Sequence, residues 1–99
     1  MIGPVGAWFR PDGPSFSPQA LLLGNVYVLI GKFDQAVALF KEALTFSPQS
    51  ALVHNNLAVA YYYNKQYDLA LRCCDKASAL GYKVEPRFLD WLRYYRKKP

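Results

Sequence analysis

The sequence has few cysteines and histidines, and this scarcity excludes most metal and redox sites. Its two cysteines are adjacent, at Cys73 and Cys74, and its one histidine is His54. Neighbouring residues on a helix point about 100° apart, so a disulfide between the two cysteines would be strained. Since no Cys/His spacing suits a metal, we expect no metal and no cofactor. We interpret both cysteines as small hydrophobic residues, buried or half-buried.

Long hydrophobic runs and catalytic constellations are also absent. No run reaches the ~18 consecutive apolar residues that a membrane helix needs, and residues 1–6 lack the basic and apolar regions of a secretory signal. We therefore expect no membrane insertion and a cytoplasmic location, unless the chain is a fragment of a larger exported protein. Because His54 has no acid–base or nucleophile partner in the sequence, we expect a packing role for it and no enzymatic function.

The composition suits one folded domain with an uneven distribution of charge. The 99 residues are 53% hydrophobic and 19% charged, which is enough apolar surface for a core. Of the net charge of +5, the residues from Lys83 onward carry +4, since they include six basic and two acidic residues. We interpret these cations as residues near the C-terminus of a terminal helix, where a positive charge interacts favourably with the negative end of the helix dipole. Nucleic-acid binding is the alternative, and a steep salt dependence of binding would support it.

What the sequence does contain is a repeat with a period of 34 residues. Five residues recur at this distance, in the pairs Leu23 and Leu57, Tyr27 and Tyr61, Asp34 and Asp68, Ala36 and Ala70, and Ala43 and Ala77. Self-similarity at a fixed period in this range predicts stacked structural units, each unable to bury its apolar face alone.

Helix start and stop signals predict two helices in each repeat and one more after them. The expected starts are Ser17-Pro18, Asp34 as a cap, Ser50 as a cap, Asp68 as a cap, and Pro86. The expected ends are Gly31, Pro48, the turn Asn64-Lys65-Gln66, and Gly81. Because the linkers are short, successive helices should be antiparallel neighbours.

The repeat resembles the tetratricopeptide repeat over about two-thirds of the chain. In 17–50 the matching residues are Leu23, Gly24, Tyr27, Ala36, Phe40, Ala43 and Pro48, and Ala20 departs from the first aromatic position. In 51–84 the matches are Leu57, Ala58, Tyr61, Ala70 and Ala77, and the departures are His54, Cys74 and Tyr82. Small residues such as Gly24 and Ala58 suit close helix crossings, and large ones such as Leu23 should fill the space around them.

The resemblance implies an all-α fold, a right-handed superhelical stack of antiparallel helix hairpins with five helices. Because glycines and prolines are frequent in residues 1–16, we expect an irregular segment there, and it contains aromatic residues. The first and second repeats are expected at 17–50 and 51–84. Residues 85–99 form a C-terminal capping helix with a basic tail. Phe88, Leu89, Trp91, Leu92 and Tyr95 make the apolar face of that helix, and its polar face holds Arg87, Asp90, Arg93 and Lys97.

The resemblance also implies a peptide-binding groove, because the first helix of each repeat in this family lines a concave side where extended peptides bind. The implied residues are Leu21, Asn25, Val28, Leu52, Asn55, Asn56, Val59, Tyr62 and Tyr63, with Leu29 beside them. An asparagine amide can both donate to and accept from a peptide backbone. Ordinary amides that are solvated or that pair helices are the alternative for Asn25 and Asn56. We therefore expect a non-enzymatic scaffold with a protein or peptide partner.

Some members of the family use asparagines at the positions of Asn25 and Asn56, with lysines, to clamp a peptide's C-terminal carboxylate. Here Leu21 occupies the first expected lysine position, and the capping helix replaces the third repeat that supplies the other basic residues. The resemblance therefore does not extend to a carboxylate clamp.

The alternative function is structural self-assembly. Arrays of this kind generally need about three repeats, and this chain has two and a cap. Trp8 and Phe9 could cover part of the groove or the neighbouring edge, in their own molecule or in a partner copy. The other possibilities are a homo-oligomer, a domain-swapped dimer, or a fragment of a longer array.

Overall fold

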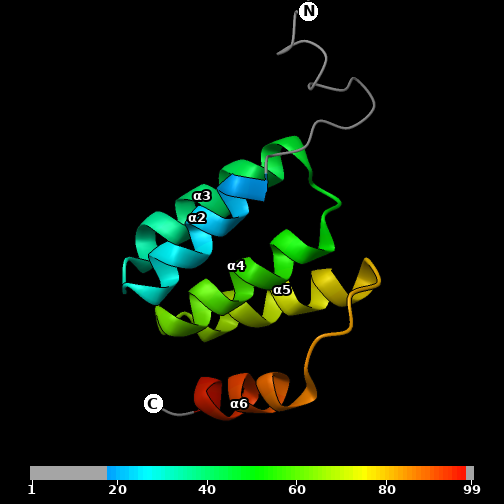
Figure 1. The fold of residues 1–99 in the computed structure, drawn as a ribbon. Coiled ribbons are helices and arrows are strands. Elements are labelled where there is room, and N and C mark those ends of the chain that lie inside the picture. The colour runs from blue at the N-terminus through cyan, green and yellow to red at the C-terminus, as the bar shows by residue number, and fades with distance from the viewer. Residues whose placement is uncertain (1–17, 98–99) are drawn as a thin grey trace, which may run out of the picture.

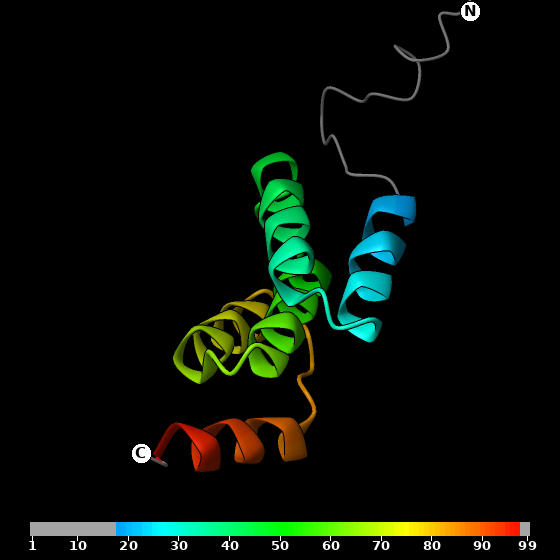
Figure 2. The same cartoon turned by 90° about the vertical axis from the view of Figure 1, so that its left-hand side faces the viewer.

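The structure is a computed structural model that describes residues 18–97, all of whose regular elements are helices. They are α2 (Pro18–Leu29), α3 (Phe33–Phe46), α4 (Ala51–Tyr63), α5 (Tyr67–Ala79) and α6 (Pro86–Lys97). The pairs α2–α3 and α4–α5 form two helix hairpins, which stack on one another, and α6 follows the second (Figures 1 and 2). The expected all-α stack of helix hairpins is confirmed, with five helices within residues 18–97.

The core lies along α4, which packs against α3 on one side and α5 on the other. Alanines allow the helices to approach closely, since Ala36, Ala58 and Ala70 are fully buried. Phe40 and Leu92 are the largest fully buried side chains. No helix within residues 18–97 has the length and apolar character needed to cross a membrane.

Gly24 lies where α2 crosses α3, and the ring of Phe40 occupies the space beside it. A Cβ at Gly24 would collide with Cε1 and Cζ of Phe40. One period later the corresponding pair is Ala58 and Cys74, both fully buried. The second repeat thus has a larger residue at the first position and a smaller one at the second. The larger side chain of Ala58 is thus compensated by the smaller one of Cys74. This compensation explains why the position of Cys74 lacks the aromatic residue of the signature.

The helix ends expected at glycine are confirmed. Gly31 and Gly81 have φ values of 82° and 98°, in the left-handed region. After α2 the backbone N–H of Lys32 donates to the carbonyl of Tyr27 at 2.8 Å, which closes the helix end. The same turn after α4 places Lys65 at φ 64°, although it is not a glycine.

Lys65→Gly is expected to raise the free energy of unfolding by about 1 kcal/mol, because a side chain in the left-handed region is strained by roughly 1–2 kcal/mol. Urea unfolding followed by circular dichroism measures the change. Lys32→Gly is the control, since Lys32 has φ −93° and gains nothing from glycine. A Lys65→Gly variant no more stable than the parent would contradict the strain.

The prediction that Asp34 and Asp68 cap the starts of their helices is wrong. The N-cap residues are Lys32 and Gln66, and neither makes a side-chain capping hydrogen bond. Both aspartates lie instead in the first helical turn, where a negative charge favours the helix dipole. Asp68 Oδ1 lies 3.7 Å from Arg96 Nε of α6.

The cap expected at Ser50 is confirmed. The hydroxyl oxygen Oγ of Ser50 accepts from the backbone N–H of Val53 at 3.3 Å. Ser50 thus satisfies one of the backbone N–H groups left free at the start of α4.

Three large side chains expected in the interior are exposed, and one of them is Tyr95, which is 38% exposed. Leu23 is 44% exposed, whereas Leu57 one period later is 4% exposed, because the first hairpin precedes α4 and no described helix precedes α2. Trp91 is 53% exposed, because α6 turns Leu92 into the core and leaves Trp91 outside. The polar face expected for α6 is present, with Arg87, Asp90, Arg93 and Lys97 all exposed.

Candidate peptide-binding groove

The α2 part of the candidate groove is a stripe of three residues at helical spacing, Leu21, Asn25 and Val28. Because they lie four and then three residues apart, they share one face of the helix. Leu21 and Val28 are half-buried and pack against the core, and Asn25 between them is exposed. The core thus fixes the two apolar side chains and leaves the amide of Asn25 at the surface.

The α4 part of the candidate groove places Leu52, Asn55, Asn56 and Val59 on one face. Leu52 is exposed, and the other three are half-buried. Within residues 18–97, the side-chain amides of Asn25, Asn55 and Asn56 make no hydrogen bond. Since α2 and α4 contact each other, the two helices bring these unengaged amides onto neighbouring elements.

Tyr62 and Tyr63, the last two expected groove residues, belong to an aromatic cluster. The Tyr62 ring centroid lies 5.0 Å from Tyr63, 5.4 Å from Phe88 and 6.2 Å from Tyr95. Burial, followed by the neighbouring Tyr95, Tyr63 and Tyr67, raises the pKa of Tyr62. Tyr62 is therefore chiefly a packing residue that joins α4 to α6.

Tyr63 is 51% exposed and keeps one face open. Its ring stacks on that of Phe33 at 5.8 Å. Of the two tyrosines, Tyr63 is thus the more exposed.

Sequence reasoning missed most of this cluster, which also includes Phe33, Tyr67, Phe88, Tyr94 and Tyr95. The signal for Phe33 and Tyr67 was the repeat itself, because they are aromatic and lie one period apart. Tyr95 stacks on Tyr67 at 5.3 Å. That contact depends on how α6 packs, which the repeat does not specify.

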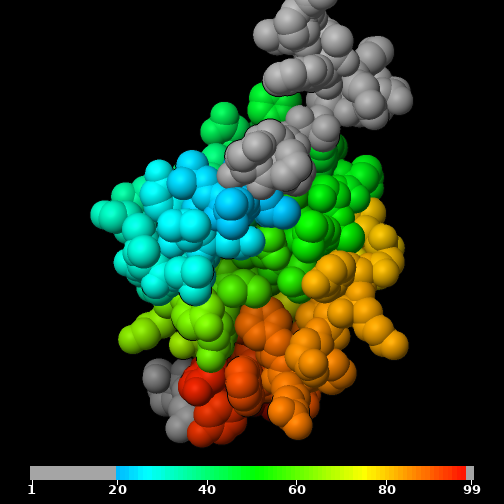
Figure 3. All heavy atoms as spheres, in the orientation of Figure 1, coloured from blue at the N-terminus to red at the C-terminus, as the bar shows by residue number. Residues whose placement is uncertain are grey.

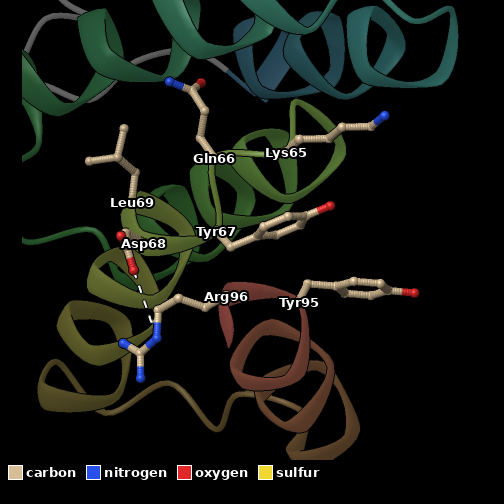
Figure 4. Close-up of a pocket in the computed structure, with 7 residues that line it drawn as sticks. All are labelled: Lys65, Gln66, Tyr67, Asp68, Leu69, Tyr95 and Arg96. Carbon is tan, nitrogen blue, oxygen red and sulfur yellow. Dashed lines mark ion pairs between the residues drawn. The ribbon is translucent and has the colours of Figure 1, made fainter. Parts of the chain in front are cut away.

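Two surface clefts lie outside the candidate groove, and none of its nine residues lines either of them. The first, of about 350 Å³, lies between α6 and the turn that joins α4 to α5. Figure 4 shows Tyr67 and Tyr95 lying over one another there, with Asp68 and Arg96 paired at its edge. The second, of about 260 Å³, lies among α3, α4 and α5.

Both cysteines are free thiols, and their burial matches the interpretation as small hydrophobic residues. Cys74 is buried and Cys73 is half-buried. Burial raises the pKa of Cys73 to about 11, although the nearby Lys41 acts in the opposite direction. Burial, with Cys73 and Asp75 nearby, raises the pKa of Cys74 to about 12. At neutral pH both therefore stay protonated, and a protonated thiol is a weak nucleophile.

Residues 1–17, including Trp8 and Phe9, lie outside the described part of the chain. The face of α2 that they were expected to approach is described. Leu22 and Leu29 of α2 are 62% and 83% exposed, and Ile30, directly after the helix, is 58% exposed. In Figure 3, α2 forms part of the surface on this face of the molecule.

Stacked helix hairpins with a 34-residue period define the chain as a helical-repeat protein. Among family models, one described as "TPR repeat" matches residues 24–65, and one described as "Tetratricopeptide repeat" matches residues 51–80. Together they span more than half of the chain. The chain belongs to the tetratricopeptide repeat family.

Curated relatives are similar over about three-quarters of the chain. The Hsp70-Hsp90 organising protein of Plasmodium falciparum (isolate 3D7) is 29% identical over 76 residues, which are 77% of this chain and 14% of the relative. Human tetratricopeptide repeat protein 28 is 35% identical over 77 residues, 74% of this chain and 3% of the relative. Anaphase-promoting complex subunit 6 of Arabidopsis thaliana is 32% identical over 82 residues, which are 78% of this chain and 15% of the relative.

The chain therefore spans only a small part of the length of these relatives. No solved structure gives a significant match. Family and fold together give the chain the general role of a protein-interaction scaffold, and proteins of this family are typically non-enzymatic.

Proposed function

We propose that α2 and α4 form a groove that binds an extended peptide of a protein partner. The observation that carries this proposal is the set of unengaged amides of Asn25, Asn55 and Asn56 on two contacting helices. Each amide can donate to and accept from a peptide backbone. The proposed groove belongs to two repeats with boundaries at 17–50 and 51–84, which place α2 and α4 as their first helices.

The chemistry of the proposed groove favours backbone and apolar contacts. None of its nine residues is charged, and Leu52 and Val59 lie beside the asparagines. Leu21 stands where a carboxylate clamp would have lysine. We therefore expect peptides with a free C-terminal carboxylate and with a C-terminal amide to bind equally well, with little dependence on salt.

The double variant Asn25→Ala/Asn56→Ala is expected to weaken peptide binding at least about tenfold, because each lost amide leaves a peptide backbone group unpaired. The probe is an extended peptide selected from a random displayed library against the whole chain. Gln49→Ala, an exposed amide outside the groove, is the control and should change the Kd less than about twofold. Equal affinities for all three proteins would contradict the proposed groove.

Self-assembly is the second candidate, and the exposure of α2 favours it. Val26 is 39% exposed, while Ala60 one period later is fully buried, and Leu23 and Leu57 differ in the same way. The helix carries no charged residue. Apart from Gln19, Asn25 and Tyr27, its side chains carry no polar group. A helix that is largely apolar on all sides is usually covered. A second copy stacked on this face would cover it, and so would residues 1–17.

Sedimentation of the full chain over a range of concentrations tests the assembly candidate. A dimer that Leu22→Lys dissociates would support assembly through α2, because Leu22 is 62% exposed on this face. A monomer at every concentration would contradict it. Deleting residues 1–14 tests whether the N-terminal segment covers α2 instead. If the parent chain is a monomer and the deletion lowers its thermal stability, these residues pack against their own chain.

A further inference from the structure

The cleft among α3, α4 and α5 lies on the side of α4 opposite the proposed groove. It has a volume of about 260 Å³ and is lined by Leu44, His54, Leu57, Tyr61, Leu69, Arg72, Cys73 and Lys76. On α4, His54, Leu57 and Tyr61 are spaced by three and four residues, so they share one face. That face points about half a turn away from Leu52 and Val59 of the groove. A ligand in the cleft would therefore not compete with a peptide in the groove.

The cleft contains a departure from the repeat signature. His54 occupies the position where the tetratricopeptide signature has a large aromatic residue. Its ring is held in place, because Nε2 lies 3.0 Å from the carbonyl oxygen of Pro48. An imidazole fills less space than an indole, and His54 and Leu57 both line the cleft. Cys73 is also small and half-buried, so the cleft keeps an apolar lining.

Three cations surround this apolar lining. Arg72 and Lys76 line the cleft, and Lys41 is close enough to Cys73 to act on its pKa. None of the three forms an ion pair within residues 18–97, and no acidic residue lines the cleft.

These cations are not a property of the repeat. One period earlier, the positions of Arg72 and Lys76 hold Ala38 and Glu42. One period after Lys41 stands Asp75. The positive rim is therefore particular to the junction between the two hairpins.

We propose that this cleft binds an apolar side chain from an acidic segment of a partner protein. The apolar side chain contacts Leu44, Leu57 and Leu69, which removes apolar surface from water. Carboxylates on either side of it pair with the cations of the rim. Charge complementarity favours this occupant. An uncharged segment would leave the cations unpaired, and a basic segment would be repelled by them.

The test uses the full chain and a fluorescein-labelled peptide with a central Leu-Phe pair flanked by glutamates, followed by fluorescence anisotropy. Arg72→Glu/Lys76→Glu is expected to weaken binding at least about tenfold at low salt. Lys83→Glu/Lys97→Glu makes the same change in net charge at exposed sites outside the cleft, and should weaken binding less than about threefold. Added salt should weaken binding to the parent chain.

A second variant separates the cleft from general charge attraction. His54→Trp restores the signature aromatic residue, fills the cleft, and should weaken binding at least about tenfold while the helical circular dichroism is kept. A peptide with glutamines in place of the glutamates should bind at least about tenfold more weakly. Asn25→Ala/Asn56→Ala should leave the affinity unchanged, so failure here and failure of the groove are distinguishable.

Three results would overturn the proposal. The first is no binding of the acidic peptide to the parent chain at millimolar concentration. The second is an equal loss in both charge-reversed variants, which would show attraction to net charge only. The third is a His54→Trp variant that binds as tightly as the parent.

Discussion

Replacing Gly24 with alanine is expected to lower the free energy of unfolding by about 1–3 kcal/mol. At an ordinary helix position the same change raises stability by roughly 0.5–1 kcal/mol, because glycine loses more backbone freedom on folding. The sign is reversed here because the new Cβ would collide with the Phe40 ring. That ring is 1% exposed, so it cannot turn into solvent. Urea unfolding followed by circular dichroism measures the difference.

The control for Gly24→Ala is the same change in a Phe40→Cys background. That background gives the first crossing the Ala–Cys pair that the second crossing has at Ala58 and Cys74. With the ring removed, alanine at position 24 should be neutral or stabilising. The double-mutant cycle should then give a coupling of about 1–3 kcal/mol. An equal loss in both backgrounds would contradict the packing described for this crossing.

Phe40→Ala is expected to lower the free energy of unfolding by about 3–5 kcal/mol, the usual range for an aromatic residue removed from a core. Phe40 is the aromatic residue among the largest fully buried side chains, and it joins α3 to α2 at Gly24. Since small domains are stable by only about 5–15 kcal/mol, this loss should be visible as a large fall in Tm.

Phe46→Ala on the same helix is the matched control. Phe46 is 46% exposed, and its removal should cost less than about 1 kcal/mol. Similar losses for both variants would contradict the assignment of Phe40 to the core, and so would a Phe40→Ala variant as stable as the parent.

The helices and their glycine ends could be predicted from the sequence because these are local properties. Periodic apolar residues, Ser50 as a cap and glycine at Gly31 and Gly81 all act within a few residues of where they stand. From the sequence alone, an aspartate at the N-cap could not be distinguished from an aspartate in the first helical turn, as at Asp34 and Asp68. An acidic side chain is favourable at both, and Phe33 and Tyr67 begin the helices.

The exposure of Leu23 and Trp91 could not be predicted, because it depends on which neighbours are present. The repeat gives Leu23 and Leu57 the same local environment, yet within residues 18–97 only Leu57 has a helix hairpin before it. The role of Tyr62 likewise depends on where α6 packs, since its partners Phe88 and Tyr95 come from that helix. The groove positions of Asn25 and Asn56 followed from the resemblance and stay a prediction.

The central proposal is that a peptide binds across α2 and α4 through asparagine amides. Two-dimensional ¹H–¹⁵N NMR of the full chain tests it most directly, because side-chain NH₂ groups of asparagine give their own signals. Titration with a peptide selected against the whole chain should shift the NH₂ signals of Asn25, Asn55 and Asn56, and leave that of Asn64 in place. Saturating peptide that shifts none of these three signals would contradict the proposal.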